Sequence, residues 1–258
     1  MLSERAHFNL RKLHSLTGIV PIGVFLLEHL FTNSFAIFGP EAFNEKVVFL
    51  TSLPYLYLIE IFFIFVPIAF HAILGVVIAA GARYNVATLG YGRNWAYFFQ
   101  RLSGLFLLVF ITVHVIKTRL SGTPPDQMFQ HMAGYLPSPV WFSFYVLGVV
   151  AAAYHFGNGL FTFAISWGIT IGKRAQRAWS IACMAIFLAL SIIGVRALYA
   201  FVAPPEVREK QLIFEHSRSD GARGEHSRSA EPGSESLRAS TRSIRSTGAG
   251  AATTGGSR

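Results

Sequence analysis

This sequence contains few charged residues and little cysteine. Only 14% of its 258 residues are charged, against about 25% in soluble domains. The mean hydropathy of +0.45 and the shortage of charge exclude an ordinary soluble fold and predict an integral membrane protein. A single cysteine, Cys183, excludes an internal disulfide and a cysteine-ligated metal cluster. No small-residue cleavage pattern follows the first apolar run, so we expect no cleavable signal peptide.

The few charges are unevenly placed. The net charge is +9, but most basic residues stand at the ends of apolar runs, where they set membrane topology. We therefore expect no nucleic-acid partner and a chain surrounded by the lipid bilayer.

Five apolar runs are each long enough to cross about 30 Å of hydrocarbon as a helix. They predict an all-α membrane protein, a five-helix bundle, with spans over residues 13–36, 56–82, 97–117, 140–165 and 179–201. Pro21 and Pro67 fall inside spans, where neighbouring helices can accommodate them. Seven glycines in the spans permit close packing of helices or of a flat ligand: Gly18, Gly23, Gly75, Gly104, Gly148, Gly157 and Gly159. No internal repeat is evident.

Basic residues predict the orientation. Nine lie on one side of the spans, namely Arg5, Arg11, Lys12, Arg83, Arg93, Arg101, Lys173, Arg174 and Arg177. The loops on the other side hold three, namely Lys46, Lys117 and Arg119. The positive-inside rule then puts the N-terminus in the cytoplasm and, after five spans, the C-terminus outside the cell (inner) membrane.

Residues 204–258 differ in composition from residues 1–203. They contain almost no large apolar side chains and so cannot bury a core, which predicts a disordered polar tail. We assign no role to His216 and His226, which fall in it.

Ionisable residues inside hydrocarbon are costly and tend to be kept for function. Each of the first four spans carries one deep histidine: His29, His71, His114 and His155. From a rise of about 1.5 Å per residue, His29 lies roughly 7 Å and His114 roughly 10 Å to the outer side of mid-membrane. His71 and His155 lie about 4 Å to the cytoplasmic side. The four therefore sort into two layers, each with one histidine from each of two helices.

Such pairs can clamp a flat macrocycle between two imidazoles. Two axial histidines fill both open positions of a haem iron, which then exchanges electrons instead of binding oxygen. Two layers predict two stacked haems. A lone membrane histidine more often bonds to a neighbouring helix or serves a proton relay, so a haem-free transporter is the alternative from another class. A relay does not need pairs of equal depth, and the layers are too far apart for one zinc ion.

Four stretches carry a family resemblance: HSLTGIVPIGVFLLEHLFTNS, FHAILGVVI, RLSGLFLLVFITVHV and YHFGNGLFTFAISWGIT. Over about residues 5–202 the chain resembles the dihaem cytochrome b558 membrane anchor of succinate dehydrogenase or fumarate reductase. The resemblance implies a five-helix bundle with two b haems, a flavoprotein and an iron–sulfur partner on the cytoplasmic side, and electron transfer to or from menaquinone or another quinone. An anchor for another quinone-linked dehydrogenase, of formate dehydrogenase or hydrogenase type, is the alternative.

The resemblance also implies roles for single residues. His71 and His155 correspond to ligands of the haem nearer the iron–sulfur subunit, and His29 and His114 to ligands of the outer haem. His14 and Ser15 fall where the family has polar residues near the inner haem's propionates. As cations at inner helix ends, Arg101 and Lys173 are further propionate candidates, with interface anchoring as the alternative.

Quinone reduction needs proton-exchanging groups, and the family's menaquinone site lies near the outer haem. The acidic candidates on that side are Glu28, Glu41, Glu45 and Glu60. We favour Glu28, which adjoins a ligand. Some anchors of this family have an acidic residue just before the fourth-helix histidine, as a possible proton path. Here Ala153 and Tyr154 precede His155, so the sequence does not predict that path.

Overall fold

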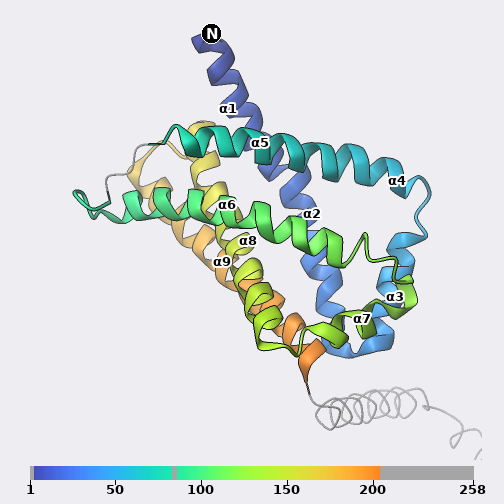
Figure 1. Ribbon diagram of the computed structural model, residues 1–258. Helices are drawn as coiled ribbons and strands as arrows, with labels where there is room; N and C mark the ends of the chain where they lie inside the picture. Colours follow the sequence, from blue (N-terminus) through green and yellow to red (C-terminus); the bar gives the residue numbers. More distant parts are fainter. Residues whose placement is uncertain (1–2, 83–85, 204–258) are drawn as a thin grey trace, which may run out of the picture. The chain divides into compact units, whose positions relative to one another are not determined.

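The computed structural model describes residues 3–82 and 86–203. The described residues do not include the predicted tail over 204–258, which contains His216 and His226. They also do not include Arg83, one of the nine basic residues counted above. Within those two ranges the secondary structure is helical and contains no strand (Figure 1).

The described residues contain five helical stretches long and apolar enough to cross a membrane: Glu4–Phe38, Leu56–Ala80, Gly92–Lys117, Pro139–Ser166 and Lys173–Val202. These stretches confirm the five predicted spans. The first, the third and the last begin earlier than predicted, because their first turns are helical but polar and so are invisible to hydropathy. At the first of these ends the Ser3 hydroxyl accepts a hydrogen bond from the Ala6 N–H at 3.3 Å, which caps the helix.

Proline divides the first span. Helix α1 covers Glu4–Ile19 and helix α2 covers Pro21–Ser34, followed by a 3₁₀ turn, η1, over Phe35–Phe38. Pro21 has no N–H to donate to the preceding turn, and it stands at the first position of α2, where none is needed. The break at Val20 lies between His14 and His29, which are therefore carried by different helices.

The second span has three parts. A short helix, α4 (Leu56–Ile59), leads into a π-helical segment, η2 (Glu60–Phe65), and then into α5 (Val66–Ala80). Pro67 in the first turn of α5 cannot donate to the turn before it, and a wider π turn accommodates the missing hydrogen bond. His71 lies one turn after this change of winding.

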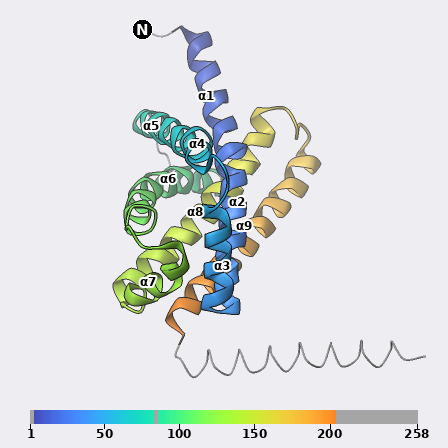
Figure 2. The same ribbon diagram turned by 90° about the vertical axis from the view of Figure 1, so that its right-hand side faces the viewer.

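Helices α6 (Gly92–Lys117), α8 (Pro139–Ser166) and α9 (Lys173–Val202) form the other three spans. Helix α8 packs against both α6 and α9, while α1 packs against α5 and α8. Figures 1 and 2 show α8 beside α9 in two views at right angles, with the first turns of α1 extending past α5. The four helices α2, α5, α6 and α8 thus each carry one of the predicted ligands.

Three short elements between the first and second spans and between the third and fourth spans were not predicted from the sequence. They are α3 (Pro40–Thr51), η3 (Pro125–Gln127) and α7 (Met128–Tyr135), and α3 packs against the other two. Buried Asn44 joins them: its Nδ2 donates to the Asp126 carbonyl (2.6 Å) and to Gln130 Oε1 (3.0 Å), and its Oδ1 accepts from the Phe129 N–H (2.9 Å). Next to it Phe43, Phe129 and Phe201 pack together and are 1–3% exposed.

Large apolar side chains cover the outside of the spans. Phe62, Phe63, Ile73 and Val77 on the second span are each 62–69% exposed. Exposed apolar surface on this scale is unusual for a soluble monomer and suits a surface that faces lipid chains.

Candidate functional site

The four deep histidines meet in two pairs. The His71 and His155 ring centres lie 6.2 Å apart at an interplanar angle of 83°. The His29 and His114 ring centres lie 5.6 Å apart, also at 83°. The pairing agrees with the two layers estimated from the sequence: α5 with α8, and α2 with α6. A metal ion held between two imidazoles by bonds of about 2 Å needs ring centres roughly 6 Å apart.

We call His71 with His155 the inner pair, and His29 with His114 the outer pair, after the orientation predicted from the sequence. Hydrogen bonds define the tautomers of the inner pair. His71 Nδ1 lies 3.0 Å from the His14 carbonyl, and His155 Nδ1 lies 3.1 Å from the Gln100 carbonyl. A carbonyl can only accept, so each Nδ1 carries the proton and each Nε2 keeps its lone pair. Metal-bound histidines are oriented in this way, with the second ring nitrogen donating to a carbonyl.

Glycines make room for the inner imidazoles. A Cβ atom added to Gly18 on α1 would lie 2.6 Å from His71 Cε1, and one added to Gly104 on α6 would lie 2.9 Å from His155 Cε1. Any other residue at either position would push the ring away. The sequence predicted that glycines permit close packing of helices or of a flat ligand, and at these two positions the group in contact is a histidine ring of another helix.

The outer pair has different surroundings. The Phe110 ring lies nearly parallel to that of His114, with centres 5.8 Å apart, and Tyr145 approaches His114 edge-on at 5.8 Å. His114 Nδ1 is buried and has no hydrogen-bond partner among the described residues. The outer layer is therefore enclosed by aromatic rings, while the inner layer is oriented by carbonyls.

His14 lies beside His71, and both His14 and Ser15 have identified structural contacts. The His14 ring stacks on that of His71, with centres 3.9 Å apart and an interplanar angle of 12°. The Ser15 hydroxyl donates to the Lys12 carbonyl (2.9 Å) and accepts from Trp167 Nε1 (3.0 Å). Lys12 Nζ in turn donates to the Ser166 carbonyl. These contacts join the start of the first span to the end of the fourth.

Arg101 and Lys173, the cations proposed from helix ends, make no described contact with the four histidines. The Arg101 guanidinium lies 3.3 Å from the centre of the Tyr97 ring and donates to the Tyr97 carbonyl at 3.0 Å. Its buried Nε has no partner among the described residues, so one donor remains available. Lys173 is exposed at the first residue of α9, and the described contacts do not join it to the histidines.

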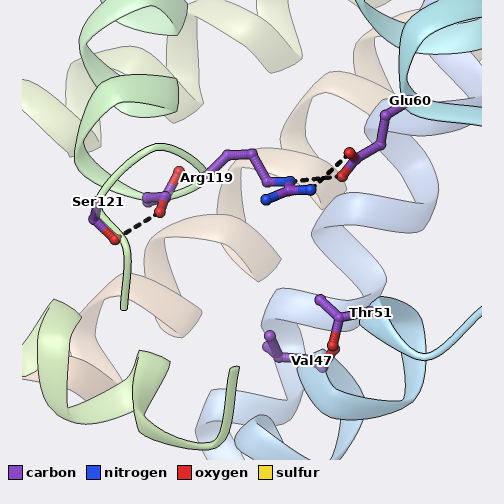
Figure 3. A network of polar contacts seen from close by, with 6 residues as sticks. Val47, Thr51, Glu60, Arg119 and Ser121 are labelled. Atoms are coloured by element: carbon purple, nitrogen blue, oxygen red, sulfur yellow. Dashed lines mark hydrogen bonds and ion pairs between the residues drawn. The ribbon is translucent and has the colours of Figure 1, made fainter. Parts of the chain in front are cut away.

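The four outer carboxylates differ in their surroundings. Glu28 is exposed beside His29 and accepts a hydrogen bond from the Thr32 hydroxyl at 2.7 Å. Glu41 and Glu45 are exposed on α3. Glu60 forms a two-point ion pair with Arg119, at 2.8 and 2.9 Å (Figure 3). The Glu60 side chain is 15% exposed. Of the two acids within the spans, Glu60 therefore has a cationic partner and Glu28 has the hydrogen bond from Thr32.

Two side chains between the third and fourth spans have a shifted pKa. Hydrogen bonding to Glu60, together with its negative charge, raises the pKa of Arg119 against an opposing effect of partial burial. Burial, and a 2.7 Å hydrogen bond between the Tyr135 and Tyr145 hydroxyls, raises the pKa of Tyr135. Both groups therefore keep their proton at physiological pH.

The inner residues fit a group that takes two imidazoles. Within residues 3–82 and 86–203, His, Cys, Asp and Glu nowhere form a group of three or more that could hold a metal ion. The histidines meet in twos instead, and two is the number of coordination positions that a haem leaves open on its iron. Two imidazoles that each keep an Nε2 lone pair, with the Nδ1 proton held by a carbonyl, are suited to ligate such a group.

Sequence reasoning missed Gln100 and Ser103. The Gln100 carbonyl and the Ser103 hydroxyl both lie 3.1 Å from His155 Nδ1, and Asn158 Nδ2 donates to Gln100 Oε1 at 2.7 Å. Polar residues facing a predicted ligand across two spans were the available signal, but without the packing of α6 on α8 they could not be assigned to His155.

Comparison with known proteins gives concordant matches. Residues 90–194 match the succinate dehydrogenase/fumarate reductase transmembrane subunit family. The succinate dehydrogenase hydrophobic membrane anchor subunit of Thermoplasma acidophilum is 32% identical over 97 residues, 38% of this chain and 77% of that relative. The succinate dehydrogenase cytochrome b558 subunit of Bacillus subtilis is 44% identical over 202 residues, 78% of this chain and all of that relative. The chain thus belongs to the family of succinate dehydrogenase cytochrome b subunits, which anchor that enzyme in the membrane.

Proposed function

We propose that this subunit holds two b haems, one between His71 and His155 and one between His29 and His114, and carries electrons between an iron–sulfur subunit and a membrane quinone. The observation that supports this most directly is the meeting of four deep imidazoles as two pairs, 6.2 and 5.6 Å between ring centres. Haem iron bound by two histidines exchanges single electrons and has no position left for oxygen.

The residues of the chain have three tasks in this function. His71 and His155 present Nε2 lone pairs, because their Nδ1 protons are donated to the His14 and Gln100 carbonyls. The aromatic rings around His114 exclude water from the outer layer. Arg101, through its unpartnered buried Nε, and Lys173 are candidates to neutralise the propionates of the inner haem.

The partners follow from the family. The relatives belong to succinate dehydrogenase, which favours a flavoprotein and an iron–sulfur subunit as partners over those of a formate dehydrogenase or hydrogenase. We place both at the end of the bundle that carries the nine basic residues, with the N-terminus in the cytoplasm of a cell that holds this chain in its inner membrane. Residues 1–203 form the anchor in this proposal, and residues 204–258 a separate polar tail.

The quinone site belongs at the outer layer. Reducing one quinone to quinol takes up two electrons, supplied through the partner subunits from succinate, and two protons, so a proton-exchanging side chain is needed. Glu28 adjoins His29 and is exposed, and Thr32 supplies a hydrogen bond to one carboxylate oxygen. We assign Glu28 to proton exchange, with menaquinone as the expected substrate.

Haem content tests the proposal. The purified complex should contain two b haems for each copy of this subunit, from the reduced spectrum and the haem-to-protein ratio. His29→Ala should remove the outer haem and His71→Ala the inner one. His29→Ala should also abolish quinone reduction while succinate oxidation with an artificial acceptor continues. Glu28→Gln should retain both haems and lower quinone turnover.

His7→Ala is the matched control, because His7 is exposed near the start of α1 and should leave haem content unchanged. One haem or none in the unaltered complex would refute the two-haem arrangement. Continued quinone reduction in His29→Ala would refute the route through the outer layer.

A further inference from the structure

The two inner histidines are supported in closely similar ways by two different helix pairs. On α1 and α5, His14 and Gly18 face His71 and Gly75. On α6 and α8, Gln100 and Gly104 face His155 and Gly159. In all four helices the glycine follows the first residue by four positions, one helical turn, and so lies on the same face.

Three contacts recur in the two sets. His71 donates from Nδ1 to the carbonyl of His14 and packs its ring on Gly18; His155 donates from Nδ1 to the carbonyl of Gln100 and packs its ring on Gly104. The side chains of His14 and Gln100 in turn approach the glycines of the helices that carry His71 and His155. A Cβ at Gly75 would lie 3.3 Å from His14 Cε1, and one at Gly159 would lie 3.8 Å from Gln100 Nε2.

A carbonyl bond alone does not set the plane of an imidazole. It fixes the tautomer and one atom, but the ring can still rock about the line from Nδ1 to the oxygen. The stacked His14 ring, 3.9 Å from His71 and tilted by 12°, opposes that motion on one face, and Gly18 packs closely against the Cε1 atom of the same ring. Gln100 acts on the opposite ligand through the backbone, since its Nε2 donates to the His155 carbonyl at 3.1 Å and its Oε1 accepts from Asn158.

We infer that His14 and Gln100 are equivalent positioning residues, which hold the planes of His71 and His155 nearly perpendicular, at the observed 83°. This inference rests on the proposed ligation of the inner haem by His71 and His155. It assigns His14 a task as a stacked ring, in addition to any contact with the propionates. The common task explains why a histidine and a glutamine stand at corresponding positions.

The angle between two axial imidazoles has its own spectroscopic readout. Perpendicular planes leave two iron d orbitals nearly equal in energy, so low-spin ferric iron gives a strongly anisotropic electron paramagnetic resonance signal with a large gmax. Because 83° is close to the perpendicular limit, rotation of either ring lowers gmax. The direction of the expected change is therefore known.

The experiment measures gmax of the inner signal and haem content in the intact complex, with the outer signal identified by its loss in His29→Ala. His14→Ala removes the stacked ring but keeps the carbonyl, and should lower the inner gmax. Gln100→Ala should do the same through His155. His14→Phe keeps a stacked ring and should keep the inner gmax, and none of the three should move the outer signal. His7→Ala is the control for a histidine of α1 outside the stack.

Loss of the inner haem in His14→Ala with retention in His14→Phe would also support the inference, because the stacked ring would then be needed to hold the ligand. An unchanged inner gmax in His14→Ala or Gln100→Ala would overturn it. Equal effects of His14→Ala and His14→Phe would overturn it as well, since the nitrogens of His14 would then matter and not its stacking. Absence of haem from the unaltered complex would instead refute the proposed function itself.

Discussion

At the scale of single residues, glycines decide where the large rings can lie. A Cβ atom added to Gly148 on α8 would lie 2.1 Å from Phe110 Cε2, and the Phe110 ring lies parallel to His114 within 18°. The position of Phe110 against His114 thus depends on the missing side chain of a residue on another helix. Gly18 and Gly104 act directly on histidines in the inner layer, whereas Gly148 acts on the outer layer through an aromatic ring.

Gly148→Ala should disturb the outer layer selectively. Phe110 is 7% exposed and has little room to move, so overpacking should destabilise the fold by about 1–3 kcal/mol and reduce the content of the outer haem while the inner one stays. Thermal unfolding and haem quantitation measure the two effects. Gly134→Ala, on α7 with nothing within 4 Å of the added Cβ, is the control. Equal loss of both haems would contradict the selective effect.

At the scale of secondary-structure elements, side chains join segments that the sequence leaves as loops. The π-helical segment η2 carries Glu60, which pairs with Arg119 just after α6. Because the Arg119 side chain is 51% exposed, water screens this pair and its contribution to stability is small. Asn44 has a larger expected effect, since it is 8% exposed and its three hydrogen bonds join α3 to η3 and α7.

Asn44→Ala should destabilise the packing of α3 against η3 and α7. It leaves the buried Phe129 N–H without its acceptor, which costs about 1–3 kcal/mol. The thermal midpoint should fall, and the amides of α3 and α7 should exchange hydrogen faster while those of α8 do not. Thr51→Ala serves as the control, because Thr51 is exposed and bonds only within its own helix. Unchanged exchange in α3 and α7 would show that Asn44 does not hold them together.

At the scale of the whole molecule, the distribution of basic residues predicts the orientation. Ser3 before α1 and Ser121 after α6 are both exposed and belong to opposite ends of the spans. The only cysteine, Cys183, is 4% exposed, so single cysteines can be introduced with little background.

In a Cys183→Ala background, Ser121→Cys should react with a membrane-impermeant maleimide on intact cells, and Ser3→Cys should react only after lysis. This result follows from an N-terminus in the cytoplasm, the side with nine basic residues. Labelling of Ser3→Cys on intact cells, with protection of Ser121→Cys, would reverse the orientation and with it the assignment of inner and outer layers.

Several features could not be read from the sequence, each for a physical reason. Asn44 and Gln100 act through partners 82 and 55 positions away in the chain, and only packing shows which carbonyl a side chain or ring reaches. In the sequence Glu60 is an isolated carboxylate in a span, and only the structure shows that Arg119, just after α6, pairs with it. The matching glycine spacings of α1, α5, α6 and α8 are too short to appear as a repeat, and gain meaning only when the helices pair.

The amino-acid sequence by itself determined the class of the protein, its five spans and the presence of one histidine deep in each of the first four. Those properties depend on the hydrophobicity of continuous segments and on the constant rise of a helix, which are both local. Tertiary structure decided which imidazole faces which, which nitrogen of His71 and His155 keeps its lone pair, and what surrounds Glu60. These depend on contacts between helices, where a few ångströms separate a ligand from a hydrogen-bonding residue.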